Sequence, residues 1–200
     1  QLITGSIYLL GQKIDEVVRS KTAKHAPYPT VCVGNFQAGG TGKTPATLWV
    51  AKQLKGLGYS PVIIIRGYRG SVSKSTIVDR QDAYAYGDET VLHAQHFPTI
   101  VGKNRLESTH LAHTIPGDKK VLIMDDGLQH YQLLKDFSIV CQKNLRFEAD
   151  AMLPIGRLRQ IPHTNVHAIL SQINEAGYQK VESWKGIPEY TFARETVLRS

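Results

Sequence analysis

Hydrophobic and polar residues alternate along this chain in blocks that predict strands and helices in turn. Short apolar runs rich in β-branched residues predict buried strands at Thr30–Val33, Pro61–Ile65, Val121–Met124, Phe137–Cys141 and Val166–Ser171, with shorter ones at 76–78 and 99–101. Helical spacing between these runs predicts helices at Ala46–Leu57, Thr90–Gln95 and about 105–113. Strands that alternate with helices favour an α/β fold, a mostly parallel sheet with helices on both faces.

The chain starts with an amphipathic segment. Apolar residues recur at helical spacing from Leu2 to Ser20, and a basic stretch, Arg19–His25, follows. Such a helix either lies in a membrane interface or packs on its own domain, and the pattern leaves both open. No apolar run in the sequence approaches the roughly 20 residues of a membrane-spanning helix.

The charge of the chain favours anionic partners. Its 200 residues carry a net charge of +7 at pH 7, which suits nucleotides, nucleic acid or an acidic membrane surface. The sequence shows no basic helix with interleaved aromatic residues and no nucleic-acid motif, which argues against nucleic acid. The two cysteines, Cys32 and Cys141, lie in apolar runs and predict buried thiols rather than a disulfide or a zinc site.

A glycine-rich loop joins the first predicted strand to the helix that follows it. The loop reads Gly39-Gly40-Thr41-Gly42-Lys43-Thr44, in the strand–loop–helix context that a P-loop requires. Glycines let successive backbone N–H groups turn toward a phosphate, and the helix adds the positive end of its dipole. Lys43 is expected to reach the outer phosphates and Thr44 to ligate Mg²⁺. Gln37 stands where the usual pattern has its first glycine.

Acidic residues follow two further elements of the pattern. The apolar run from Val121 ends in Asp125-Asp126-Gly127, which is the Walker B pattern of a strand that delivers a carboxylate to a P-loop metal. Gly87-Asp88-Glu89 leads into a predicted helix. These two acids either cap the helix dipole or serve as a general base and a metal-linked acid, and the tripeptide alone does not decide.

Basic residues follow other predicted strands. Arg66 comes directly after the Pro61–Ile65 strand, at the end where α/β folds bind ligands, and either contacts a phosphate or belongs to a surface turn. Lys103 and Arg105 are placed to face anionic groups in the same way. His130 follows the Walker B acids and is either a substrate contact or a structural histidine.

The combined set of motifs resembles the tetraacyldisaccharide 4′-kinases, the lipid A 4′-kinases of Gram-negative bacteria. The matching pieces are Val33-Gly34-Asn35, Gly39-Gly40-Thr41-Gly42-Lys43-Thr44-Pro45, Arg66-Gly67-Tyr68, Gly87-Asp88-Glu89, Val101-Gly102-Lys103-Asn104-Arg105, Asp125-Asp126-Gly127-Leu128-Gln129-His130, and Leu153-Pro154-Ile155-Gly156 with Leu158-Arg159. Asp-Asp-Gly-Leu-Gln-His and the Gly-Asn pair are far more specific than a P-loop. The P-loop of that family also lacks the first glycine, in agreement with Gln37.

The resemblance implies a RecA-like P-loop domain followed by a smaller second domain that is mostly absent. It divides the chain into a membrane-associating helix at 1–28, a kinase domain at 29–175, and the start of a truncated second domain or a linker at 176–200. It implies transfer of the γ-phosphate of ATP, with Mg²⁺, to the 4′-hydroxyl of a lipid A disaccharide 1-phosphate. It also implies peripheral attachment to the cytoplasmic face of the inner membrane, with no nucleic acid and no obligate protein partner.

The resemblance also assigns residue roles. It gives catalytic roles to Lys43 and to Asp88, the latter as base, and makes Thr44, Glu89, Asp125 and Asp126 the metal ligands. The nucleotide contacts that it implies are Gln37, Ala38, Gly39, Gly40, Thr41, Gly42, Lys43 and Thr44. The implied substrate contacts are Arg66, Arg105, His130 and Arg159.

Some positions depart from the family pattern. Thr90 replaces a usual proline, and Gln142 replaces a usual aspartate. A histidine motif of the family's second domain, which supports the catalytic aspartate, has no counterpart before Ser200, so we expect a truncated kinase rather than a shortened, catalytically impaired relative. The rival from another class is a P-loop regulatory ATPase that binds DNA or a protein partner.

Overall fold

A mostly parallel sheet forms the centre of the fold. The computed structural model describes residues 11, 13–67, 72, 74–79, 83–143, 151–163, 165–173 and 183–193. Within them the eight strands lie in the order β3-β4-β2-β5-β1-β6-β7-β8. Their bounds are β1 Thr30–Gly34, β2 Ser60–Ile65, β3 Thr76–Ile77, β4 Thr99–Val101, β5 Lys120–Asp125, β6 Phe137–Lys143, β7 Ala168–Ile173 and β8 Glu189–Ala193. Among the described strands, only β3 runs antiparallel, at the edge of the sheet.

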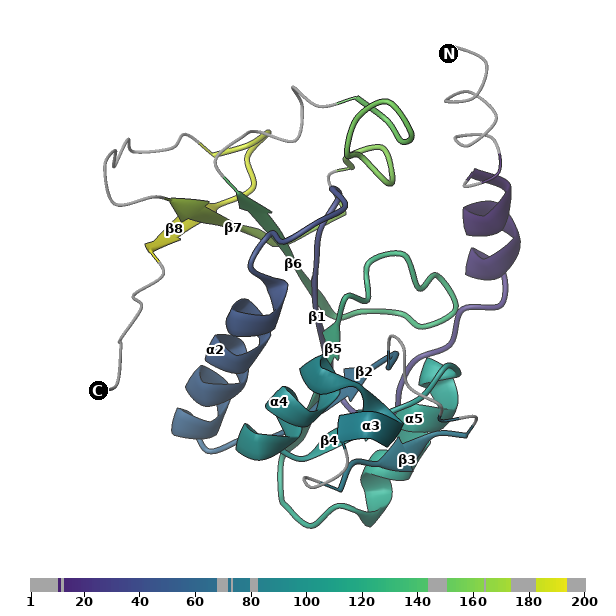
Figure 1. Ribbon diagram of the computed structural model, residues 1–200, viewed down its shortest axis with the longest axis vertical. Coiled ribbons are helices and arrows are strands. Elements are labelled where there is room, and N and C mark those ends of the chain that lie inside the picture. Colours follow the sequence, from purple (N-terminus) through teal and green to yellow (C-terminus); the bar gives the residue numbers. More distant parts are fainter. Residues whose placement is uncertain are drawn as a thin grey trace.

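Helices cover both faces of this sheet, as the sequence predicts. α2 (Lys43–Gly56) and α4 (Asp88–His96) lie side by side, and α5 (Arg105–Leu111) continues into the short helix η1 (Ala112–Thr114) (Figure 1). Val50 of α2 belongs to the same apolar cluster as Ile63 of β2, whereas Ala112 of η1 clusters with Val62 and Ile64. Because successive residues of a strand point to opposite faces, α2 and η1 pack on opposite sides of β2.

The strand order brings the P-loop and the Walker B acids together. The chain leaves β1 for α2 and returns two positions away in β2, so that β5 lies between β1 and β2. Val33 of β1 is in register with Asp125 of β5. The loop that begins after Gly34 therefore emerges directly beside the acids at the end of β5.

Several elements differ from the predicted ones. α4 starts at Asp88 rather than Thr90, so both acids of the Gly87-Asp88-Glu89 motif lie in its first turn. Residues 11 and 13–20 are helical, while the other residues of the predicted helix from Leu2 lie outside the described residues. β8 was not predicted, because its sequence, Glu-Tyr-Thr-Phe-Ala, is not an apolar run; it pairs with β7 in the same sheet. The division at 175 stays a prediction.

The two cysteines are free and buried, as predicted. Burial raises the pKa of Cys32 to about 11 and that of Cys141 to about 12. Both thiols are therefore protonated and unreactive at neutral pH.

Gly34, at the end of β1, is required by close packing. A Cβ atom at this position would lie 2.5 Å from Cγ of Leu128, which belongs to the core beneath the P-loop. We expect Gly34→Ala to lower the free energy of unfolding by about 1–3 kcal/mol, as overpacked cores do.

Urea unfolding of the purified protein measures this effect. Gly56→Ala is the matched control, because a Cβ atom there meets nothing within 4 Å and Gly56 has no positive φ. Equal unfolding midpoints for the two variants would contradict the packing argument.

Candidate active site

The loop between β1 and α2 has the backbone of a phosphate cradle. Gly39 (φ 110°) and Gly42 (φ 82°) occupy left-handed conformations that favour glycine. A Cβ atom at Gly39 or Gly40 would meet open space. Gly42 is the N-cap of α2 and offers no side chain to the first turn of the helix. The N–H groups of that turn are therefore available to an anion.

A second loop, 151–163, holds the start of the P-loop in place. The Ala38 N–H donates to the Arg157 carbonyl at 2.6 Å, and the Arg159 N–H donates to the Phe36 carbonyl at 2.8 Å. Between them Gln37 pairs with Leu158 in an isolated antiparallel bridge. Gln37 is thus part of a strand-like pairing that any residue can adopt, which explains why this P-loop needs no glycine there.

The two Walker B acids point in different directions. The carboxylate of Asp125, 2% exposed, lies in the core: its Oδ2 is 2.8 Å from His93 Nε2, and its Oδ1 accepts from Thr47 Oγ1 at 3.1 Å. Asp126 follows with a positive φ of 51°, which turns its carboxylate toward the P-loop. There it pairs with Arg159 and lies 3.9 Å from Lys43 Nζ.

Positive charges keep Asp126 ionised. Burial alone raises the pKa of this carboxyl, but the hydrogen bond from Arg159 and the charges of Lys43, Arg159 and Arg105 outweigh it. The resulting pKa is below the usual value for aspartate. Asp126 is therefore an anion at neutral pH, as a metal ligand must be.

The acidic turn of α4 faces the same P-loop. The Thr44 hydroxyl donates to the Glu89 carboxylate, so the first turn of α2 contacts the first turn of α4. Asp88, the first residue of α4, is exposed beside Glu89. The structure thus brings together Lys43, Thr44, Glu89 and Asp126, with Asp88 next to them and the Asp125 side chain held beneath. Their catalytic and metal-binding roles stay predictions.

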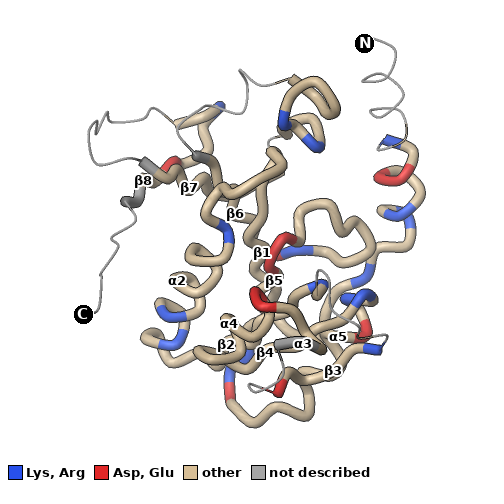
Figure 2. The backbone as a smooth tube through the Cα atoms, in the orientation of Figure 1, with Lys and Arg blue, Asp and Glu red and all other residues tan. Residues whose placement is uncertain are grey.

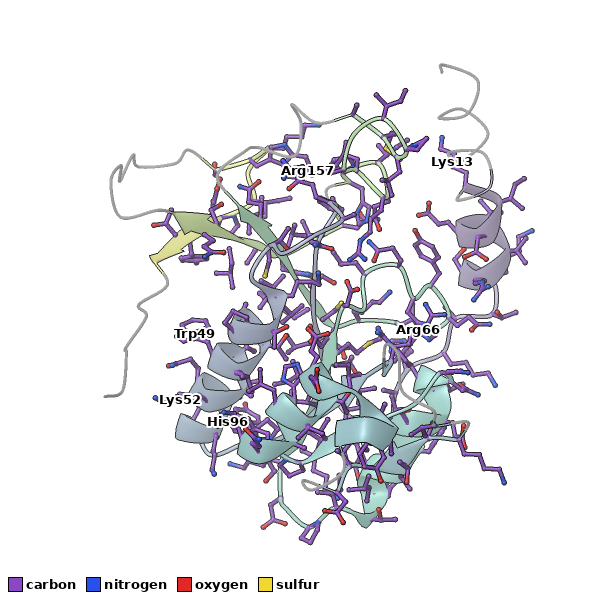
Figure 3. The ribbon with its side chains drawn as sticks, in the orientation of Figure 1. Lys13, Trp49, Lys52, Arg66, His96 and Arg157 are labelled. Atoms are coloured by element: carbon purple, nitrogen blue, oxygen red, sulfur yellow. The ribbon has the colours of Figure 1, made fainter. Side chains whose placement is uncertain are left out.

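Four of these residues, Lys43, Glu89, Asp125 and Asp126, line a cleft of about 1130 Å³. Its walls include all four predicted substrate contacts, which are Arg66, Arg105, His130 and Arg159. Figure 2 shows acidic and basic positions meeting near the ends of β1 and β5, and Figure 3 shows Arg66 beside this region. Arg105 is 3% exposed and donates from its NH2 to the Asp125 carbonyl at 2.9 Å.

The N-terminal segment also contributes to the cleft. Asp15 and Arg19, from the helix at 13–20, form an ion pair on one wall, and Lys24 adds further positive charge. The amphipathic pattern of this segment left open whether it packs on its own domain or lies in a membrane interface. The cleft is thus more basic than its predicted residues alone.

His130 is neutral at physiological pH. Burial, followed by the nearby charges of Arg105 and Lys135, lowers its pKa from 6.5 to about 4. Its Nε2 is buried and has no hydrogen-bond partner among the described residues. A neutral imidazole can form a hydrogen bond with a ligand without adding charge to the site.

The lowered pKa of His130 makes stability depend on pH. Between pH 6.5 and about 4 the unfolded chain binds a proton that the folded chain does not, so stability falls as the pH is lowered through this window. We expect His130→Asn to lose less stability than the unsubstituted protein between pH 7 and about 4.5. Urea unfolding at several pH values measures it, with the exposed His110→Asn as control; parallel curves for the His130 variant and the parent would refute it.

No group of three or more His, Cys, Asp or Glu side chains in the described ranges is placed to hold a metal ion by itself. Mg²⁺ is commonly held by one or two carboxylates together with substrate phosphates and water. Thr44, Glu89 and Asp126 form a donor set of that kind, because they surround the loop where phosphates would lie.

A strand, a glycine-rich loop ending in Lys-Thr, and acids at the end of the neighbouring strand define a P-loop nucleoside-triphosphate-binding fold. A family model described as tetraacyldisaccharide-1-P 4′-kinase matches residues 5–198. The chain therefore belongs to this family, and the resemblance seen in its motifs is confirmed.

Named relatives agree with this assignment. The chain is 40% identical over 141 residues to the tetraacyldisaccharide 4′-kinase of Nitrosococcus oceani, an alignment that covers 67% of the chain and 41% of that protein. For the enzyme of Methylorubrum extorquens the identity is 44% over 145 residues, 68% of the chain and 44% of the relative. The chain thus spans about half the length of the curated relatives that it matches.

A solved structure supports the fold. The structure described as the "apo" form of LpxK from Aquifex aeolicus in complex with ATP matches with a TM-score of 0.81 and 26% identity, over 95% of this chain and 62% of that one. The predicted α/β P-loop fold, with its mostly parallel sheet, is confirmed.

Proposed function

We propose that this protein transfers the γ-phosphate of ATP to the 4′-hydroxyl of a tetraacyldisaccharide 1-phosphate. The observation that carries the proposal is the meeting of Lys43, Thr44, Glu89 and Asp126 at the phosphate cradle, on one side of a cleft whose other walls are basic. Membership of the kinase family supports the reaction, and the ATP in the related LpxK structure supports the phosphate donor.

The transfer needs positioning and neutralisation of charge more than covalent help from the protein. The loop amides and Lys43 hold the β- and γ-phosphates. Thr44, Glu89 and Asp126 would hold Mg²⁺, which would supply positive charge to neutralise the charge that develops on the transferred phosphate. Asp88, at the first turn of α4 and beside this set, accepts the proton of the sugar hydroxyl. The buried Asp125 acts through its hydrogen bonds rather than as a direct ligand.

The substrate carries a phosphate of its own, which suits the basic walls of the cleft. Arg66 and Arg105 offer guanidinium groups, which pair well with phosphate oxygens. The neutral His130 adds a hydrogen bond without further charge.

The helix at 13–20 suits a lipid substrate at a membrane surface. Ile14, Val17 and Val18, spaced for one helical face, are 55%, 55% and 61% exposed, while Asp15 and Arg19 face the cleft. None of the helices that the structure describes has the length and hydrophobicity to cross a membrane. We propose peripheral attachment through this exposed apolar face to the cytoplasmic side of the inner membrane.

Charge placed on this face should weaken attachment. We expect Val17→Asp combined with Val18→Asp to lower sedimentation with vesicles containing phosphatidylglycerol by about tenfold, since each substitution both removes apolar area and adds repulsion. Leu57→Asp, at a still more exposed position at the end of α2, is the control. Equal losses for both changes would refute the role of the helix.

Transfer of labelled phosphate tests the proposed reaction. The full-length protein is incubated with γ-labelled ATP, Mg²⁺ and tetraacyldisaccharide 1-phosphate in mixed micelles, and label is expected in a lipid product. An acceptor already phosphorylated at the 4′ position is the control and should take up none. Label released only as inorganic phosphate, and faster with DNA, would favour a regulatory ATPase; nucleotide binding without any turnover would favour a catalytically impaired relative.

A further inference from the structure

His93 lies in the middle of α4 and no motif pointed to it. Its side chain is fully buried, and Nε2 is 2.8 Å from Oδ2 of Asp125, which is itself 2% exposed. With the Asp125 carboxylate as acceptor, this bond requires the His93 tautomer that carries its proton on Nε2. This bond is buried, and it connects α4 directly to β5, the strand that ends at the site.

Asp125 connects three helices through this and two further bonds. Its Oδ1 accepts from Thr47 of α2 at 3.1 Å, and its carbonyl accepts from Arg105, the first residue of α5. Both carboxylate oxygens of Asp125 are therefore bonded inside the core, one to α2 and the other to α4.

A second connection between α2 and α4 lies one turn closer to the cleft. Thr44 precedes Thr47 by three residues, and Glu89 precedes His93 by four, which are the spacings that place residues on the same helix face. Thr44 donates to Glu89 at the P-loop. Hydrogen bonds therefore join α2 and α4 at two levels. The exposed level is the Thr44–Glu89 bond at the site. The buried level, beneath it, consists of the bonds that link Thr47 and His93 to Asp125.

We propose that His93 is a positioning residue that fixes the acidic turn of α4, with Asp88 and Glu89, against the P-loop helix. The exposed level breaks when Thr44 and Glu89 turn to a metal and phosphates, as the proposed function on which this inference rests requires. The buried level is then the direct polar bond that still holds α4 to the end of β5. Without it, the carboxylates lose their alignment while the nucleotide cradle on α2 stays intact.

Hydrogen exchange tests the connection without any turnover. His93→Leu removes the donor, and His93→Gln keeps an N–H group the same number of bonds from the backbone. Val91→Ala, which trims a buried apolar residue of the same helix, is the control for general loosening. In the full-length protein, His93→Leu is expected to speed exchange of the amides at 88–94 by about tenfold or more, and His93→Gln by less than about threefold.

Kinetics then separate positioning from nucleotide binding. With ATP and lipid acceptor, His93→Leu is expected to lower kcat by about tenfold to a hundredfold and to raise the Mg²⁺ concentration for half activity. Binding of ATP, measured separately by calorimetry, should change by less than about threefold. His93→Gln should restore most of kcat.

Comparison of the His93 and Val91 variants decides whether His93 has this positioning role. Equal effects of Val91→Ala and His93→Leu on exchange and on kcat would overturn the inference, as would parallel losses of ATP binding and kcat in His93→Leu. If His93→Leu does not fold, a His93→Gln protein that exchanges at 88–94 as fast as Val91→Ala also overturns it. If the parent protein transfers no phosphate at all, the proposed function fails, and the exchange result alone still decides the role of His93.

Discussion

Replacing Asp88 with asparagine is expected to lower kcat for phosphate transfer by about 10²- to 10⁴-fold, the usual contribution of a positioned general base. Asp88 begins α4 beside Glu89, whose carboxylate contacts Thr44 of the P-loop helix. Asparagine keeps the shape of the side chain but cannot accept the proton of the sugar hydroxyl. Because the substitution removes an interaction made only in the transition state, the affinity for ATP should stay within about threefold of the parent value.

Steady-state kinetics with a lipid acceptor, together with calorimetric titration of ATP, measure both parts of this expectation. Asp118→Asn is the matched control, since Asp118 is an exposed acid in the turn before β5. Turnover near the parent rate in Asp88→Asn would show that another group, with Glu89 the nearest candidate, takes the proton.

Replacing Lys43 with alanine is expected to lower kcat by about 10²- to 10³-fold, the typical cost of removing one preorganised group that stabilises transition-state charge. Unlike the Asp88 variant, this protein should also bind ATP more weakly. Lys43 is the first residue of α2, its side chain is largely buried, and its ammonium lies 3.9 Å from Asp126. Without it, Asp126 loses a compensating charge and the outer phosphates lose their cation.

Lys52→Ala is the matched control for Lys43. Lys52 lies on the same helix, is exposed, and points outward from α2 (Figure 3). Isothermal titration with ATP and initial rates with the lipid acceptor give the two readouts. Unchanged ATP affinity in Lys43→Ala would place the phosphates elsewhere than in the loop 39–44.

The strands and the P-loop were predictable because both depend on local sequence. β-Branched runs such as Pro61–Ile65 favour buried strands, and a glycine-rich loop ending in Lys-Thr between a strand and a helix is the pattern of a P-loop. The meeting of the P-loop with Asp125 and Asp126 follows from the same reasoning, because two neighbouring parallel strands end at one edge of the sheet.

Other features depend on contacts between distant segments and left no local signal. The pairing of Gln37 with Leu158 joins residues 121 positions apart, and the cleft receives Arg19 from a helix whose pattern left open whether it packs on the domain or lies in a membrane interface. The sequence alone gave no reason to assign different roles to the two Walker B acids, Asp125 and Asp126. The positive φ of Asp126 separates them, so that one faces Lys43 while the other bonds His93 in the core.

A crystal structure of the full-length protein with a non-hydrolysable ATP analogue, and with Mn²⁺ in place of Mg²⁺, would locate the phosphates and the metal. The anomalous signal locates the metal independently of the nucleotide. We expect Mn²⁺ in contact with Thr44 Oγ1 and with the carboxylate of Glu89 or Asp126, and the γ-phosphate beside Lys43. A metal held away from these side chains, or phosphates outside the loop 39–44, would contradict it.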